Sequence, residues 1–113
     1  MLTAPECVPP TSVGSIGALR QATEGMRYIL SSEAILTFQQ DFRNQKFIED
    51  ATGGILIDDD PGVITTIYNI GDGLTGLRGQ LTEFGGMMQF SVTADIGAPS
   101  STGNTLTPQA VSL

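Results

Sequence analysis

The sequence predicts a mainly β protein with one or two helices, of the α+β class, in which a small β-sheet domain is flanked by extended N- and C-terminal arms. Its length is the first observation, because 113 residues provide one small core and not two. Short β-branched or alternating runs separated by turns fill residues 15–96, the expected single globular domain. Prolines punctuate residues 1–14, and glycine, serine, threonine and proline dominate residues 97–113, so each end is expected to be an extended arm.

The domain is expected to start with a helix and to continue with a strand. Apolar residues recur at three- and four-residue steps from Ile16 to Leu30, and Ser15 is a suitable N-cap, so the spacing predicts a helix over residues 16–30. Residues 34–42 begin with apolar side chains in alternation and contain aromatic residues, and this pattern predicts a strand.

Two short strands around an acidic turn are expected next. The apolar residues 55–57 and the β-branched run 63–70 predict the strands, and the Asp-Pro-Gly sequence between them predicts a tight connection. Asp58, Asp59 and Asp60 are expected to be solvated in that turn. Their alternative role is a weak cation site shared with a partner, since carboxylate oxygens suit calcium and magnesium.

Residues 87–94 give the clearest strand, because apolar and polar residues alternate along them and predict one buried and one wet face. The preceding residues 63–84 also allow one long helix that would serve assembly. Their apolar side chains follow heptad spacing: Val63, Ile67, Ile70, Leu74, Leu77, Leu81 and Phe84. Four glycines inside this segment disfavour a helix, so a strand followed by a glycine turn is the main prediction.

The glycine turn at residues 71–76 spells G-x-G-x-x-G and resembles the fingerprint of dinucleotide-binding Rossmann domains. An apolar run precedes it, and Asp95 follows at about the spacing of the acid that holds the ribose in those domains. The resemblance implies a small nucleotide-binding or regulatory domain. Only residues 96–113 follow this acid, too few for the remaining β-α units. A flexible turn between strands is therefore the main prediction, and nucleotide binding is the alternative.

The composition excludes several kinds of enzyme. Histidine and tryptophan are absent, and Cys7 is the only cysteine. The chain therefore has no histidine base, no Ser-His-Asp triad, no Cys-His dyad and no histidine-bearing zinc site, and Cys7 cannot form an intramolecular disulfide. We expect no enzymatic activity, and no catalytic residue, cofactor or metal.

The charge distribution argues against two classes of partner. The formal net charge is −7, and the excess lies after residue 46, where Arg78 is the only base among eight acids. This field repels nucleic acids and anionic bilayers, so neither is an expected partner. No run approaches the roughly eighteen apolar residues of a membrane span, and the first residues lack the basic start of a secretory signal, so no membrane targeting is expected.

Charge is also scarce over the whole chain, which contains one lysine, while glycine, serine, threonine and proline together exceed a third of the residues. A free monomer needs a charged surface to stay soluble, whereas a subunit held among neighbours does not. This combination of size, composition and layout resembles the small structural proteins of virions, particularly the capsid cement or decoration proteins of tailed bacteriophages.

The resemblance implies a non-enzymatic homo-oligomer, a dimer or trimer, on the capsid surface of the virion, and in the host cytoplasm during assembly. Its arms would clamp neighbouring copies of the major capsid protein or of another shell protein. A subunit of another tube- or shell-like assembly is a further alternative. The expected interface residues are the large apolar side chains of the arms: Leu2, Val8, Leu106, Val111 and Leu113.

Overall fold

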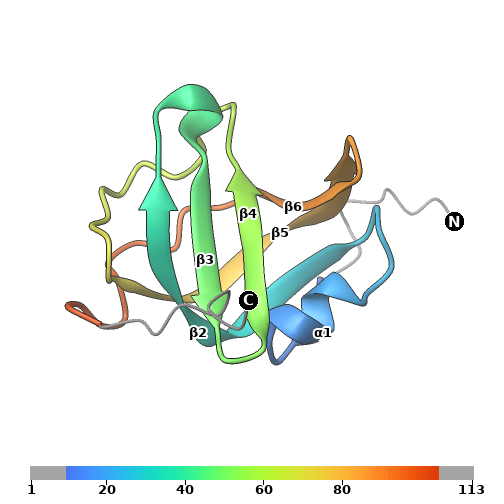
Figure 1. Ribbon diagram of the computed structural model, residues 1–113, viewed down its shortest axis with the longest axis horizontal. Coiled ribbons are helices and arrows are strands. Elements are labelled where there is room, and N and C mark those ends of the chain that lie inside the picture. The colour runs from blue at the N-terminus through green and yellow to red at the C-terminus, as the bar shows by residue number, and fades with distance from the viewer. Residues whose placement is uncertain (1–9, 105–113) are drawn as a thin grey trace, which may run out of the picture.

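The computed structural model describes residues 10–104, and strands dominate this region (Figure 1). The strands are β1 (Thr11–Val13), β2 (Arg27–Gln39), β3 (Lys46–Asp50), β4 (Gly53–Asp58), β5 (Gly73–Phe84) and β6 (Met87–Val92). A short helix, α1 (Ile16–Arg20), and a 3-10 turn at Phe42–Asn44 are its other regular elements. The predicted mainly β fold class is confirmed.

Five of the strands close into a barrel. Their hydrogen-bonded order is β2-β3-β4-β6-β5, and β5 pairs back onto β2. The β4–β6 pair is parallel and the other barrel pairs are antiparallel, while β1 lies outside the ring as a parallel partner of β2. A five-stranded Greek-key barrel is the architecture of OB folds. Such folds host many unrelated functions, so the architecture alone assigns none.

The barrel closes where the two longest strands, β2 and β5, pair with each other. Along β5, Leu77 and Leu81 face the core with Gly79 between them. A Cβ on Gly79 would lie 2.5 Å from the carbonyl oxygen of Ser91, so glycine is required for β5 and β6 to approach each other here. The buried apolar core comprises Ile16, Leu19, Tyr28, Leu30, Ala34, Leu36, Ile48, Ile55, Ile57, Tyr68, Leu74, Leu77, Leu81, Phe90 and Val92.

The helix predicted over residues 16–30 is wrong in its length, because α1 has five residues. Its start agrees with the prediction, since the Ser15 Oγ accepts a hydrogen bond from the backbone N–H of Ala18 at 3.0 Å. After α1 the chain turns through Gly25, whose φ of 85° is readily adopted only by glycine. The chain then enters β2, in which residues near its start alternate between buried and partly exposed positions.

The strand predictions are correct for the segments that pair with a neighbouring strand of the barrel. β6 covers most of the predicted strand 87–94, β4 includes residues 55–57, and β2 covers most of residues 34–42 before the 3-10 turn begins. Residues 63–70 were expected to form a strand, but they form an irregular loop. The alternative helix over residues 63–84 is also wrong, because its second half is the strand β5.

The described parts of both arms lie against the barrel. In the N-terminal arm, β1 pairs with β2. In the C-terminal arm, residues 97–104 run beside the start of β5, where Gly73 and Ser101 form an antiparallel bridge. The expected domain spans residues 15–96. The folded domain therefore also includes described residues that precede residue 15 and described residues that follow residue 96.

Candidate functional site

The glycine motif at residues 71–76 forms the entrance to β5. Its first residues make a turn after an irregular loop, and the rest lie within β5, which is antiparallel to β2. The predicted turn between two strands is therefore wrong. A dinucleotide fingerprint needs a helix N-terminus at this point to receive the pyrophosphate. Since a strand occupies that position, the motif does not have the geometry that the nucleotide-binding alternative requires.

The glycines of this motif instead admit the C-terminal segment, residues 97–104. A Cβ on Gly73 would lie 2.1 Å from the Glu33 Oε2 and 2.5 Å from the Ser101 Oγ. The backbone N–H of Gly73 donates to the carbonyl oxygen of Ser101 at 2.8 Å. At Gly71, a Cβ would lie 3.1 Å from a backbone oxygen of the same segment. Small residues are therefore needed for the segment to reach the edge of β5.

Glu33 fastens the C-terminal segment through its carboxylate. The hydroxyl groups of Ser100 and Ser101 donate to its Oε2 at 2.6 and 2.7 Å. These two hydrogen bonds hold the pKa of Glu33 below its ordinary value, and the bond from Ser100 has the larger effect. The Asn104 Nδ2 adds a bond of 2.8 Å to the carbonyl oxygen of Gly71. The motif that imitates a phosphate loop is thus a docking point for the chain's own residues.

The acidic turn is not solvated as predicted, because Asp58 and Asp59 are buried and only Asp60 is exposed. Asp58 receives a bidentate pair of hydrogen bonds from Arg43, both at 2.8 Å. The hydrogen bond from Arg43 lowers the pKa of the Asp58 carboxyl, against the opposing effect of burial. Within residues 10–104, no group of three or more His, Cys, Asp or Glu side chains is arranged to hold a metal ion.

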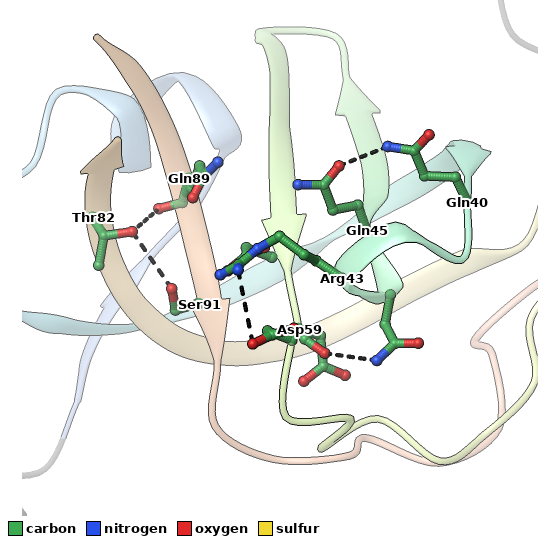
Figure 2. Close-up of polar contacts among 10 residues, drawn as sticks. Gln40, Arg43, Gln45, Asp59, Thr82, Gln89 and Ser91 are labelled. Atoms are coloured by element: carbon green, nitrogen blue, oxygen red, sulfur yellow. Dashed lines mark hydrogen bonds and ion pairs between the residues drawn. The ribbon is translucent and has the colours of Figure 1, made fainter. Parts of the chain in front are cut away.

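Asp59 shapes the loop that follows the acidic turn. Its side chain is fully buried, and its two carboxylate oxygens accept the backbone N–H groups of Val63 and Ile64 at 2.8 and 2.9 Å. Its carbonyl oxygen also accepts a hydrogen bond from the Asn44 Nδ2 at 3.0 Å (Figure 2). These bonds use the donors that a strand would offer to a neighbour, which explains the irregular loop at residues 63–70.

The β2–β3 loop and the β4–β5 loop meet at one end of the barrel, which we call the loop end. The Gln39 Nε2 donates to the carbonyl oxygen of Tyr68 at 2.9 Å, and the two loops flank a polar cavity of about 380 Å³. Two apolar side chains stand out of this surface, since Phe42 is 67 % and Ile67 is 87 % exposed. The exposed apolar and acidic residues that define the loop end are Phe38, Asp41, Phe42, Asp60, Ile67 and Ile70.

A second surface lies on the β5–β6 hairpin, which extends on the opposite side of the barrel in Figure 1. Its turn, Gly85 and Gly86, separates Phe84 and Met87, which are 76 % and 53 % exposed. The outward residues of the hairpin define what we call the hairpin face: Arg78, Gln80, Thr82, Phe84, Met87, Gln89 and Ser91. Thr82 hydrogen-bonds to the Gln89 carbonyl oxygen and the Ser91 hydroxyl, which gives this face an uncharged centre (Figure 2).

The expected interface residues of the arms lie outside the described residues: Leu2, Val8, Leu106, Val111 and Leu113. The sequence analysis did not single out the exposed apolar surfaces of the barrel. A signal for them was present in the heptad pattern, which included Ile67, Ile70 and Phe84 as assembly positions. The structure places these residues on two separate surfaces and not on one helix.

Comparisons with family models, with curated proteins and with solved structures gave no significant match. In the described part of the chain, no helix has the length and apolar character that a membrane crossing requires.

Proposed function

We propose that the protein is a non-enzymatic subunit of a larger assembly, and that it acts as a cement or decoration subunit on a phage capsid. One observation carries this proposal. Around a complete buried core, seven large apolar side chains of the described residues are more than half exposed. Exposed apolar surface of this kind is typical of a protein that has partners. A capsid is the assembly that we favour, because size, composition and layout resemble those of capsid cement proteins.

The buried polar residues at the ends of the strands and in the loops support a structural role. The four buried polar residues among residues 10–104 are Gln45, Asp58, Asp59 and Asp72. Each holds a neighbouring loop: Gln45 accepts from the Gln40 amide at 2.7 Å, and Asp72 accepts from the backbone N–H of Asn69 at 2.8 Å. The two other residues carry the contacts to Arg43 and to the β4–β5 loop described above. These groups are used in contacts that hold loops of the fold in place, which is the role expected in a structural subunit.

The proposed partners are a shell protein, such as a major capsid protein, and further copies of this chain. In this arrangement the arms, the loop end and the hairpin face together make the contacts with these partners. The capsid surface would be the location of the protein in the virion.

Fractionation of the cells that produce the protein tests the proposal. Particles are separated from soluble protein on a density gradient, and the chain is quantified in each fraction by mass spectrometry. We expect the chain to sediment with a shell protein at a fixed ratio. A chain that stays in the soluble fraction as a compact monomer would overturn the proposal. A melting temperature that then rises with NAD or ATP would support the nucleotide-binding alternative.

A further inference from the structure

Two of the basic residues of the described region, Arg27 and Arg78, lie away from the loop end on the outer surface of β2 and β5. Along β5, Leu77, Gly79 and Leu81 face inward, so Arg78 points outward because side chains alternate along a strand. Arg27 of β2 lies diagonally beside Arg78, since the register pairs residue 27 with 80 and residue 29 with 78. Two arginines thus lie on the outer surface of these strands.

No acidic side chain of β5 or β6 belongs to the hairpin face. Glu83 is the only acid on these two strands, and it pairs with Met88 and is exposed on the side opposite the hairpin face. There it approaches Glu24, and repulsion between the two carboxylates raises the pKa of Glu24. The hairpin face therefore carries one positive charge, that of Arg78, and no negative charge beside its apolar residues, in a protein whose net charge is −7.

The loop end has the opposite character. Asp41 and Asp60 are exposed there, beside the buried Asp58 and Asp59, while Arg43 and Lys46 are its basic residues. Arg43 is already bound to Asp58, and it lies 3.7 Å from Asp60. The acids exceed the bases, and the exposed Phe42 and Ile67 stand among them. The loop end is therefore acidic and apolar.

We propose that the hairpin face of one copy docks on the loop end of the next copy, in a head-to-tail contact between identical chains. This inference rests on the proposed assembly function and names the mode of self-association. Both surfaces expose large apolar side chains, and their charges are complementary, so each surface provides what the other requires. The occupant of each surface is a second copy of this chain.

The position of the two surfaces determines the kind of assembly. In Figure 1 the β5–β6 hairpin and the β4–β5 loop lie on opposite sides of the barrel. One copy therefore uses its hairpin face for one neighbour and its loop end for another. Contacts of this heterologous kind produce closed rings when the rotation closes and filaments when it does not. A symmetric dimer with identical surfaces in contact is not the expected product.

Two variants of the full chain separate the two halves of the contact. The face variant is Arg78→Glu with Phe84→Ser, and the loop variant is Asp60→Lys with Ile67→Ser. All four positions are exposed, so both variants are expected to retain the thermal midpoint of the parent protein. The matched control is Arg20→Glu, which reverses an exposed arginine on α1, outside both surfaces.

Sedimentation velocity from about 1 µM to about 1 mM, the range of weak association, provides the measurement. We expect the parent protein and the control to form oligomers larger than dimers, and each variant alone to associate at least about tenfold more weakly. An equimolar mixture of the two variants retains one intact hairpin face and one intact loop end. It should therefore form a one-to-one dimer and nothing larger.

Three results would overturn the inference: a parent protein that stays monomeric, a variant that associates as strongly as the control, or a mixture that forms no dimer. If one variant alone keeps full association, the contact is isologous and the head-to-tail arrangement is wrong. The proposed function is tested separately by the particle fractions. A chain that sediments with a shell protein but fails the mixing experiment loses only the head-to-tail contact.

Discussion

Replacement of Asp59 by alanine tests whether the acidic turn is a structural element. The substitution leaves the backbone N–H groups of Val63 and Ile64 without their carboxylate partner, at a side chain that is fully buried. A hydrogen bond to a charged group contributes about 1.5–3 kcal/mol, and water can replace part of it in a loop, so we expect a loss of about 2–4 kcal/mol in the free energy of unfolding. For a domain of this size, the midpoint should fall by roughly 10–25 °C.

Asp60 provides the matched control, because it is the next residue along the chain and carries the same charge. Its side chain is 60 % exposed and lies 3.7 Å from the Arg43 guanidinium, so Asp60→Ala should change the free energy of unfolding by less than about 1 kcal/mol. Urea denaturation and thermal unfolding of both variants measure the difference. Small and equal losses in the two variants would refute the structural role of Asp59 and restore the solvated turn that the sequence predicts.

Three further predictions concern the barrel, the ion pair and the C-terminal arm. Gly79→Ala should lower the free energy of unfolding by about 2–3 kcal/mol, because its Cβ would lie 2.5 Å from the Ser91 carbonyl oxygen. Urea denaturation measures this change, and a decrease of less than about 0.5 kcal/mol would contradict the close spacing of β5 and β6. The pKa of Asp58 is below its ordinary value of 3.8 in the folded protein, so the contribution of Asp58 to stability is present above pH 3.8 and is lost as the pH falls further. Melting curves from pH 2 to pH 7 should therefore show a weaker pH dependence for Arg43→Gln than for the parent protein. An equal pH dependence would contradict the coupling between Arg43 and Asp58. Deletion of residues 105–113 should leave the thermal midpoint unchanged and reduce incorporation into particles, and a chain that unfolds would contradict the assignment of these residues to an interface.

The sequence predicted the fold class because strand alternation is a local property. In β6 the alternation of apolar and polar residues agrees with the buried positions of Phe90 and Val92. The pairing of β2 with β5 joins residues about forty to fifty positions apart, and no local pattern indicates which strands close a barrel. For the same reason the helix was extended too far, since the periodicity from Ile16 continues by coincidence through Gly25 into the first residues of β2.

The surfaces were harder to predict than the strands. Ile67 belongs to a β-branched run that favours a strand by propensity, but a strand also needs a neighbour with free backbone groups. Asp59 takes two of the N–H groups of this run, so the run becomes a loop and its apolar side chains remain outside the barrel. The same buried carboxylate thus explains both the failed strand prediction and the exposed apolar residue.

Three of the five basic residues bear on the proposed head-to-tail contact. The attraction between a base and an acid is strongest when the two charges lie within a few ångströms of each other. Arg43 gains such an attraction through its pair with Asp58, and Lys46 shares the loop end with Asp41. Arg78 does not, because it has no salt bridge within residues 10–104 and stands on a face without acids. An acidic loop end of a second copy would supply the missing carboxylates, and Phe84 and Ile67 would then leave water in the same contact.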